Sequence, residues 1–213
     1  MITAALAGVA PCLLDADAVL VDLGDSLVLV TAPVDAEGVE TVDRARRAGR
    51  VTRVPDVVEA TIDDPAAIVL ARARGALGTA AQLVGLARAM LDLAVAHVID
   101  RHQFGVPVGS FQAVKHHLAD AALAIEFAAP AVARAAWSVA AGEPTIQRDV
   151  SMAKALAGDA ASVAGRASLQ CHGAIGYTVE HDLHLFLKRA WALERAWGDR
   201  AFHADQVAAA IGL

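Results

Sequence analysis

The chain has 213 residues, of which 56% are hydrophobic and only 4% aromatic, and this alanine-rich composition favours close-packed helices over a β-sandwich. The formal net charge of −6 argues against non-specific nucleic-acid binding. No apolar run reaches about 18 residues without a charge and the N-terminus lacks a basic stretch, so we expect neither a membrane span nor a signal peptide. Because Cys12 and Cys171 form no pattern, we expect a reduced, cytoplasmic setting.

Residues 1–62 are predicted to form a small β region. Gly24-Asp25 lies between two runs rich in valine and leucine, which is a strong hairpin signal. A turn is expected over 32–38. The segments expected as strands are 18–24, 26–31, 51–54 and 57–58. Because so few strands are marginal alone, this sheet should pack on another part of the protein or be completed by strands outside the chain.

Residues 63–213 are predicted to form an up-down four-helix bundle, so the fold class is mainly α with a small β region before it. Asp63-Asp64-Pro65 is typical of a helix start, because an acidic N-cap precedes a proline. Ser110 is the expected N-cap of the second helix, which Pro130 should kink. The helices are expected at about 63–100, 110–141, 145–169 and 179–196, with an amphipathic tail at 201–211.

Three glycines in the first predicted helix, Gly75, Gly78 and Gly85, each lower the helix propensity by about 1 kcal/mol relative to alanine. We interpret them as positions of close helix–helix contact. Two histidine pairs, His181-x-x-His184 and His116-His117, have metal-like spacing. Because neither pair has a third ligand nearby, we interpret them as solvated helix residues and expect no metal site.

Two polar loops, 101–112 and 170–178, should lie at the same end of an up-down bundle and can therefore meet one ligand. Arg101 can fork onto a phosphate, and a glutamine amide can pair with a polar ring or a diphosphate. The glutamines are Gln103, Gln112 and Gln170. Gly173 and Gly176 let the backbone approach a ligand, while Phe104 and Phe111 can form apolar walls. The alternative is that these residues cap helix ends and that both phenylalanines plug the core.

The two loops carry a family resemblance. The first, Arg101-x-Gln-Phe-Gly-x-Pro-x-x-x-Phe-Gln112, resembles the C-terminal signature of the acyl-CoA dehydrogenases. The second, Gln170-Cys-His-Gly-Ala-Ile-Gly-Tyr-Thr-Val-Glu180, is similar to the family's Gln-x-x-Gly-Gly-x-Gly-Tyr/Phe-Thr-x-Glu, and Lys188-Arg189 lies where the family usually has an arginine. The resemblance covers about residues 63–200, and 1–62 looks like the end of the family's middle β-domain.

The resemblance implies an FAD enzyme that dehydrogenates acyl-CoA thioesters at Cα–Cβ and passes electrons to an acceptor of the electron-transfer flavoprotein type. In the family, the two bundle loops hold the adenosine diphosphate part of a partner subunit's FAD. Carried over by motif, one group contacts the diphosphate, namely Arg101, His102 and Gln103. A second group lines the adenine side, namely Phe104, Phe111 and Gln112. The rest complete the cradle, namely Gln170, Cys171, His172, Gly173 and Ala174.

The resemblance also shows departures. Trp197 stands at the family's usual position for the catalytic base, and Gly75 stands at the alternative position. Neither residue can abstract a proton. Asp199 and Glu194 are weak substitutes, and Ala174 replaces a motif glycine. We also expect the N-terminal helical domain, which helps to build the acyl pocket, to be missing.

Three functions remain open. The first is a base-lacking subunit of a heteromeric dehydrogenase, as used by actinobacterial enzymes on sterol-derived CoA thioesters, with a related subunit as partner. The second is a homo-oligomeric dehydrogenase represented by a fragment. The third is a helical-bundle interaction module without an enzymatic role. The intact loops argue against the third, and the missing bases argue against the second.

Overall fold

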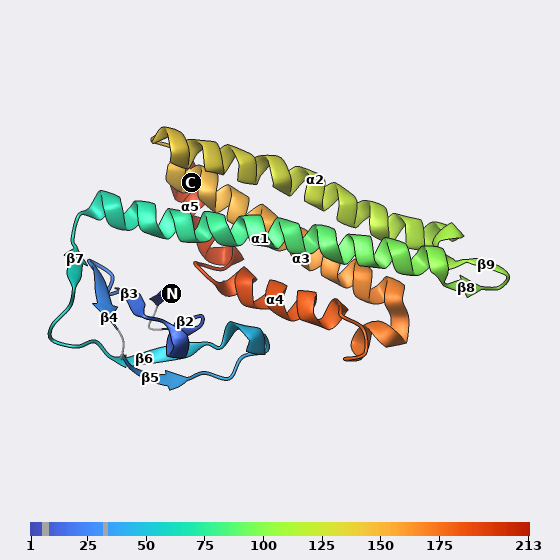
Figure 1. The fold of residues 1–213 in the computed structure, drawn as a ribbon. Coiled ribbons are helices and arrows are strands. Elements are labelled where there is room, and N and C mark those ends of the chain that lie inside the picture. The colour runs from blue at the N-terminus through green and yellow to red at the C-terminus, as the bar shows by residue number, and fades with distance from the viewer. Residues whose placement is uncertain (6–8, 32–33) are drawn as a thin grey trace. The chain divides into compact units, whose positions relative to one another are not determined.

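The structure of the chain is a computed structural model that describes residues 1–5, 9–31 and 34–213 (Figure 1). It divides into two compact units, Met1–Arg72 and Ala73–Leu213. The last strand of the first unit ends at Ile62 and the first α-helix begins at Pro65, so the unit boundary lies inside that helix. The division into a β-domain remnant over 1–62 and a bundle over 63–213 stays a prediction.

The first unit is built on two sheets over the residues that the structure describes. One has the order β1-β3-β4-β7, with β1 parallel to β3 and the other pairs antiparallel. Its strands are β1 Ile2–Ala5, β3 Ala18–Asp22, β4 Leu27–Thr31 and β7 Ala60–Ile62. The other has the order β2-β6-β5, with strands β2 Val9–Ala10, β6 Gly49–Arg53 and β5 Asp35–Gly38. Inward-facing residues such as Val19, Val21, Val28 and Val30 form the core of the first unit.

The hairpin predicted around Gly24-Asp25 is confirmed: Val19 pairs with Val30, and Gly24 has the positive φ of 95° that its turn needs. The strand at 51–54 is confirmed in large part by β6. The turn at 32–38 is wrong where it is described, because 35–38 form β5; residues 32–33 lie outside the described residues. No strand forms at 57–58, since the chain there is still bending toward β7.

The second unit is a helical bundle (Figure 1). The helices are α1 Pro65–Asp100, α2 Gln112–Ala141, α3 Ile146–His172, α4 Leu183–Arg195 and α5 Arg200–Ile211. Its main core is made largely of alanine with a few larger side chains such as Leu83, Met90, Ile125 and Leu187. Small side chains let the helix backbones approach closely. The bundle of helices, preceded by a small β region, confirms the predicted mainly α fold.

The start of α1 is as predicted: Asp64 accepts a hydrogen bond from the Ala66 backbone N–H at 3.0 Å. The predicted cap of α2 is wrong. Ser110 ends a 3₁₀ turn, Val108–Ser110, and its hydroxyl donates to the Pro107 carbonyl, so α2 begins one residue later without a side-chain cap. Pro130 lies inside α2, which continues to Ala141, and the kink stays a prediction.

The third helix is one turn longer than expected, and the fourth begins later. α3 reaches His172 before Gly173, at a φ of 64°, ends it. A 3₁₀ turn, Gly173–Tyr177, follows, and α4 begins only at Leu183. Gln170, Cys171 and His172 are therefore on a rigid last helical turn rather than in a loop.

Two helices, α1 and α2, are long and apolar enough to cross a membrane by length and composition alone. We expected no membrane span. That expectation therefore rests on the charged residues of the two helices and on their packing. α1 contributes Leu83, Ala87 and Met90 to the shared core of the bundle. Core helices of water-soluble bundles meet the same two criteria, so we interpret both as bundle helices.

Candidate functional site

The first loop is a small hairpin that extends from the end of α1. Strands β8 His102–Gln103 and β9 Val106–Pro107 pair antiparallel, with Gln103 opposite Val106. The turn residues Phe104 and Gly105 have φ values of 55° and 82°. Two successive positive φ angles define a type I′ turn, which suits a two-residue hairpin, although a phenylalanine there is strained.

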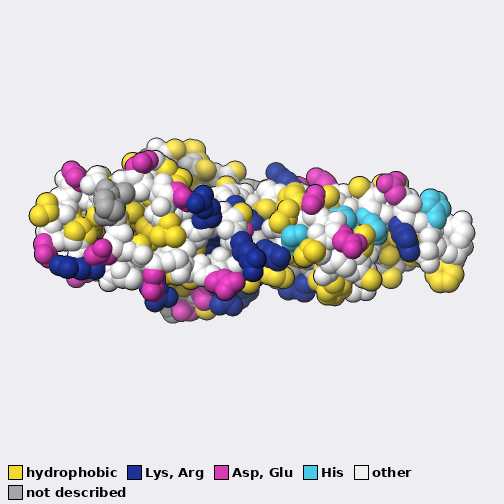
Figure 2. Space-filling view, turned by 60° about the horizontal axis from the view of Figure 1, so that its bottom comes forward, with side chains coloured by type: hydrophobic (Ala, Val, Ile, Leu, Met, Phe, Trp, Pro, Cys, Tyr) yellow, Lys and Arg dark blue, Asp and Glu magenta, His cyan; other side chains and the backbone are white. Residues whose placement is uncertain are grey.

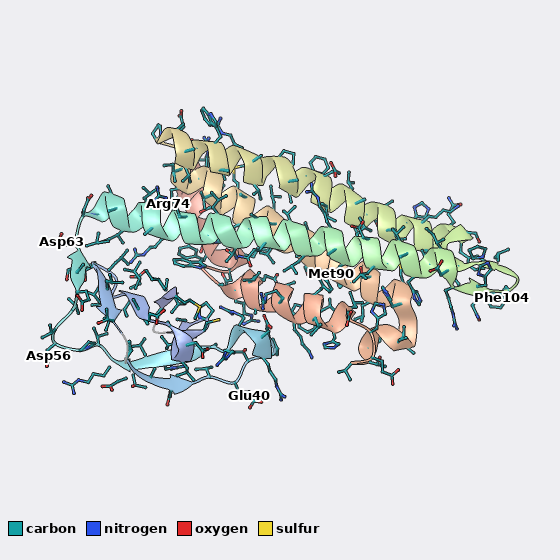
Figure 3. All side chains as sticks on the ribbon, in the orientation of Figure 1. Glu40, Asp56, Asp63, Arg74, Met90 and Phe104 are labelled. Carbon is teal, nitrogen blue, oxygen red and sulfur yellow. The ribbon has the colours of Figure 1, made fainter. Side chains whose placement is uncertain are left out.

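The aromatic residues of this loop do not plug the core. Phe104 is 93% exposed at the tip of the hairpin (Figure 3), and Phe111 is 38% exposed. Their rings meet edge to face with centroids 6.2 Å apart. The alternative in which both rings fill the bundle interior is therefore wrong for Phe104. A large apolar side chain held in solvent by a strained backbone indicates a contact with something outside this chain.

The polar residues of the first loop are also exposed. The amide nitrogen of Gln103 donates to the His102 carbonyl at 2.7 Å, and His102 Nδ1 donates to the Asp100 carbonyl at 3.0 Å. Arg101 and Gln112 are exposed, and their side chains form no hydrogen bond within the described part of the chain. Arg101 can therefore present all its donors to an anion.

The second loop is shaped by two glycines. Gly173 ends α3 with its N–H bonded to the Gln170 and Leu169 carbonyls. Gly176 is buried, and a Cβ there would lie 2.9 Å from the Cβ of His172, so no larger residue fits without movement. Gln170, Gly173 and Ala174 are exposed, whereas burial raises the pKa of the half-buried Cys171 thiol.

The two loops meet at one end of the bundle, as the up-down arrangement predicted. His97, one turn before Arg101, stacks on His172 with ring centroids 4.5 Å apart. A pocket of about 430 Å³ opens beside them, lined by Leu93, Ala96, His97, Asp100, Arg101 and His181. Sequence reasoning missed His97 and His181 as members of this site. His97 lies on the same helix face as Arg101, which was the available signal.

The histidine pairs with metal-like spacing behave differently from each other. His116 and His117 are exposed on α2, as expected. His181 and His184 are only partly exposed: His181 packs edge to face on His172, and His184 Nδ1 accepts a hydrogen bond from Lys188 Nζ at 3.3 Å. Within the described ranges, no three His, Cys, Asp or Glu side chains are arranged to hold a metal ion.

Gly75 and Trp197, which the resemblance predicts at the family's two base positions, are in contact. A Cβ built on Gly75 would lie 2.4 Å from the fused-ring atoms of Trp197. The indole therefore occupies the space that a side chain at position 75 would need. Gly75 is therefore a position of close contact, but its partner is a side chain in the segment between α4 and α5 and not another helix as predicted. A Cβ added at Gly78 or Gly85 would meet nothing within 4 Å in the described residues. The interpretation of these two glycines as positions of close helix–helix contact is therefore wrong.

The loop that carries Trp197 is strained and firmly held. Trp197 and Gly198 have φ values of 61° and 98°. His203 Nε2 donates to the Trp197 carbonyl at 2.9 Å, and Lys154 Nζ donates to the carbonyls of Glu194 and Gly198 at 2.9 and 3.0 Å. Strain of this kind persists only where surrounding contacts over-determine the backbone.

Asp199 and Glu194, predicted above as weak substitutes for the catalytic base, have other contacts. The side chain of Asp199 accepts a hydrogen bond from the Phe202 backbone N–H at 2.9 Å and so caps α5. Glu194 is half-buried at the end of α4, and its side chain lies near Gly158 on α3.

Burial of Lys154 should make the free energy of unfolding depend on pH. Lys154 is 2% exposed, and burial lowers its pKa from 10.5 to about 8, partly offset by the charges of Glu194 and Asp199. The folded pKa lies below the unfolded one, so between these values the unfolded chain binds more protons and stability rises with pH. Relative to Lys154→Met, the wild-type free energy of unfolding should increase by about 3 kcal/mol between pH 8 and 10.5.

Urea denaturation of both proteins at pH 7.5, 9 and 10 tests this expectation. Groups that titrate elsewhere affect both curves equally, so only the difference between the two proteins matters. Parallel stability profiles would show that the ammonium group is not penalised by burial.

Comparisons with known proteins identify the class. The family model for the acyl-CoA dehydrogenase C-terminal domain matches residues 68–212. The acyl-CoA dehydrogenase IpdE2 of Mycobacterium tuberculosis is 36% identical over 179 residues, which cover 79% of this chain and 52% of that protein. The chain therefore belongs to the acyl-CoA dehydrogenase family, whose members are FAD-dependent oxidoreductases. It spans about half the length of this curated relative.

Solved structures share the fold. A steroid ACAD, the G363A variant of Tcur3481–Tcur3483, has a TM-score of 0.88 at 23% identity, covering 99% of this chain and 62% of that chain. The ChsE4–ChsE5 complex from Mycobacterium tuberculosis has a TM-score of 0.83 at 23% identity, covering 99% and 62%. At this level of identity the likeness concerns the fold.

Proposed function

We propose that this chain is a subunit of an FAD-dependent acyl-CoA dehydrogenase that completes a flavin site across a subunit interface and lacks its own catalytic base. One observation carries the proposal: the residues that match the family's flavin loops extend outward from the bundle. Phe104 is almost fully exposed, and Arg101 is exposed beside it. Such residues contact a ligand only if it is held largely by another chain.

The residues present fit the diphosphate and adenine parts of FAD. Arg101 can bind a phosphate with two parallel N–H donors, and Gln103 and Gln112 can pair with polar atoms beside it. Phe104 offers an unoccupied aromatic face for the adenine ring. Exposed Gly173, which has no side chain, lets the backbone approach the ligand. The buried Nε2 of His172, without a partner among the described residues, is a further polar atom facing this end. When bound, FAD supplies the acceptor for the substrate hydride.

We propose that the base comes from the partner chain. An indole at position 197 packed on a glycine at position 75 leaves no carboxylate and no room for one. Asp199 is engaged as a helix cap, and Glu194 ends a helix held by Lys154. The role of this chain is then to bind and orient the cofactor rather than to move the α-proton.

The partner and substrate are proposed from the relatives. Two structures with this fold are named as a complex of two chains, ChsE4–ChsE5, and as a steroid dehydrogenase pair, Tcur3481–Tcur3483. These names favour a related dehydrogenase subunit as partner and a sterol-derived acyl-CoA as substrate. We further propose an acceptor of the electron-transfer flavoprotein type and a cytoplasmic location.

FAD binding should be measured on the purified complex of this chain with its related dehydrogenase subunit. Arg101→Ala should weaken this binding by about 10- to 100-fold, because a charge-assisted hydrogen bond contributes about 1.5–3 kcal/mol. Flavin absorbance per mole of complex and an FAD titration measure this loss. Arg88→Ala, at an exposed arginine on α1 away from the loop, is the control and should retain full occupancy.

The same preparation separates the three functions. Flavin that appears only in the mixed complex supports the proposal. A yellow and active homo-oligomer of this chain alone would instead support a self-sufficient dehydrogenase. Absence of flavin from every state would leave the interaction module.

A further inference from the structure

Three histidines from separate segments form a cluster at the loop end of the bundle. His172, the last residue of α3, stacks on His97 of α1 at 4.5 Å and meets His181, which precedes α4, edge to face at 4.4 Å. The centroids of His97 and His181 are 6.5 Å apart. Figure 2 shows histidine side chains gathered toward the β8–β9 end of the visible face.

Hydrogen bonds fix the tautomers of two of these rings. His172 Nδ1 lies 2.7 Å from the Ser168 carbonyl and must donate to it. His172 is 5% exposed, and its Nε2 has no partner among the described residues. His181 Nδ1 accepts from the Leu183 N–H at 3.1 Å, so its proton is on Nε2 when the ring is neutral. The cluster therefore contains one buried nitrogen without a hydrogen-bond partner among the described residues, which is unfavourable.

The electrostatics of the cluster oppose protonation. Burial lowers the pKa of His97, as do the charges of His181 and Arg101, while Asp100 raises it. Burial also lowers the pKa of His172; the hydrogen bond to Ser168 raises it, and the neighbouring rings lower it again. An anion nearby would reverse this balance, because an opposite charge within about 4–6 Å favours the protonated ring.

An anion bound in the pocket beside the cluster would lie next to Arg101. His97 and His181 line it together with Arg101 and Asp100, and His172 lies against both histidines. These are the charged and titratable groups that act on the cluster from the end of α1, the end of α3 and the segment before α4. His172 is buried behind the two lining histidines, so protonation of the cluster would attract an anion in the pocket through the added positive charge.

We infer that this histidine cluster couples flavin binding to proton uptake: a diphosphate held at Arg101 draws a proton from solvent onto the cluster, so FAD binds more tightly as the pH falls. The inference rests on the proposed function and adds His97 and His181, together with the already predicted His172, as positioning residues for the diphosphate. The internal diphosphate of FAD keeps a constant charge near neutral pH, so the proton is taken up by the protein.

The test is the pH dependence of FAD binding by the complex with the partner subunit, followed by flavin fluorescence. We expect binding about tenfold weaker at pH 8 than at pH 6, the effect of one coupled proton over part of its range. His97→Gln should reduce this dependence to less than about threefold. His116→Gln, an exposed histidine outside the pocket, should leave it unchanged. An equally steep dependence in His97→Gln and His172→Gln would overturn the inference.

A measurement on the wild-type chain avoids reliance on variants that fold poorly. The eight histidines can be followed by their C2 proton resonances, with and without sulfate, which remains a dianion over this range. Sulfate should raise the midpoints of the cluster histidines by about one pH unit and leave buried His203 unchanged. Midpoints that do not move overturn the inference, as does a response to sulfate with pH-independent FAD binding. If Arg101→Ala still lowers FAD occupancy, the proposed function survives either failure.

Discussion

Gly75→Val is expected to destabilise the helical unit by about 3 kcal/mol, because the new side chain would overlap the indole of Trp197. A Cβ at this position already lies 2.4 Å from the ring, which is far inside van der Waals contact. The ring cannot move aside easily, since the backbone of its loop is held by Lys154 and His203. Urea denaturation followed by circular dichroism measures the change.

The control for this substitution lies three residues further along the same helix. Gly78 is exposed, and a Cβ there meets nothing within 4 Å in the described residues. Gly78→Ala should therefore leave stability unchanged or increase it by up to about 1 kcal/mol through helix propensity. If Gly75→Val behaved like this control, the packing of Trp197 on α1 would be wrong.

A double-mutant cycle isolates the contact itself. In a Trp197→Ala background, the space above position 75 is empty, so Gly75→Val should cost much less than in the wild type. We expect a coupling free energy of about 2 kcal/mol. Such coupling would show that the indole of Trp197 closes the space beside position 75, so that a carboxylate side chain could be placed there only after the indole is removed.

The sequence predicted the bundle well because local signals were strong. Asp64 before Pro65 marked the start of α1, and the Gly24-Asp25 pair marked the β3–β4 hairpin. The end of α3 was placed too early because the polar sequence Gln170-Cys-His looks like a loop, although it continues the helix to Gly173. Short strands such as β1 and β2 have no periodic pattern and gain stability only from their neighbours.

The site was predicted in part, and its gaps have a physical cause. The motifs and the up-down order placed the two loops at the same end, where the structure brings Arg101 and His172 to one corner of the bundle. His97 was missed because one histidine in an apolar helix has no periodic pattern of its own, and its only signal was its place one turn before Arg101. The contact of Gly75 with Trp197 depends on tertiary packing between segments far apart in the chain.

The joint between α2 and α3 is built around one buried carboxylate, Asp149, which is 4% exposed. It accepts hydrogen bonds from Ser138 and Arg134 of α2, from Thr145 in the turn and from Arg148 beside it. Burial alone would raise its pKa, but the bonds from Ser138, Arg148, Thr145 and Arg134 outweigh burial and hold the pKa well below its usual range.

Asp149→Asn should therefore lower the free energy of unfolding by about 4 kcal/mol near neutral pH, since it leaves two arginines and two hydroxyls without their shared acceptor charge. For a chain of this length the melting temperature should fall by about 10 °C.

The folded pKa of Asp149 is depressed, so this stabilisation is present above the unfolded pKa of 3.8 and is lost as the pH falls through the folded value. The difference between wild type and variant should be constant above about pH 5 and shrink below pH 4. Asp159→Asn, which breaks only the exposed ion pair with Arg200, should cost less than about 1 kcal/mol; equal losses in the two variants would show that burial does not strengthen the Asp149 network.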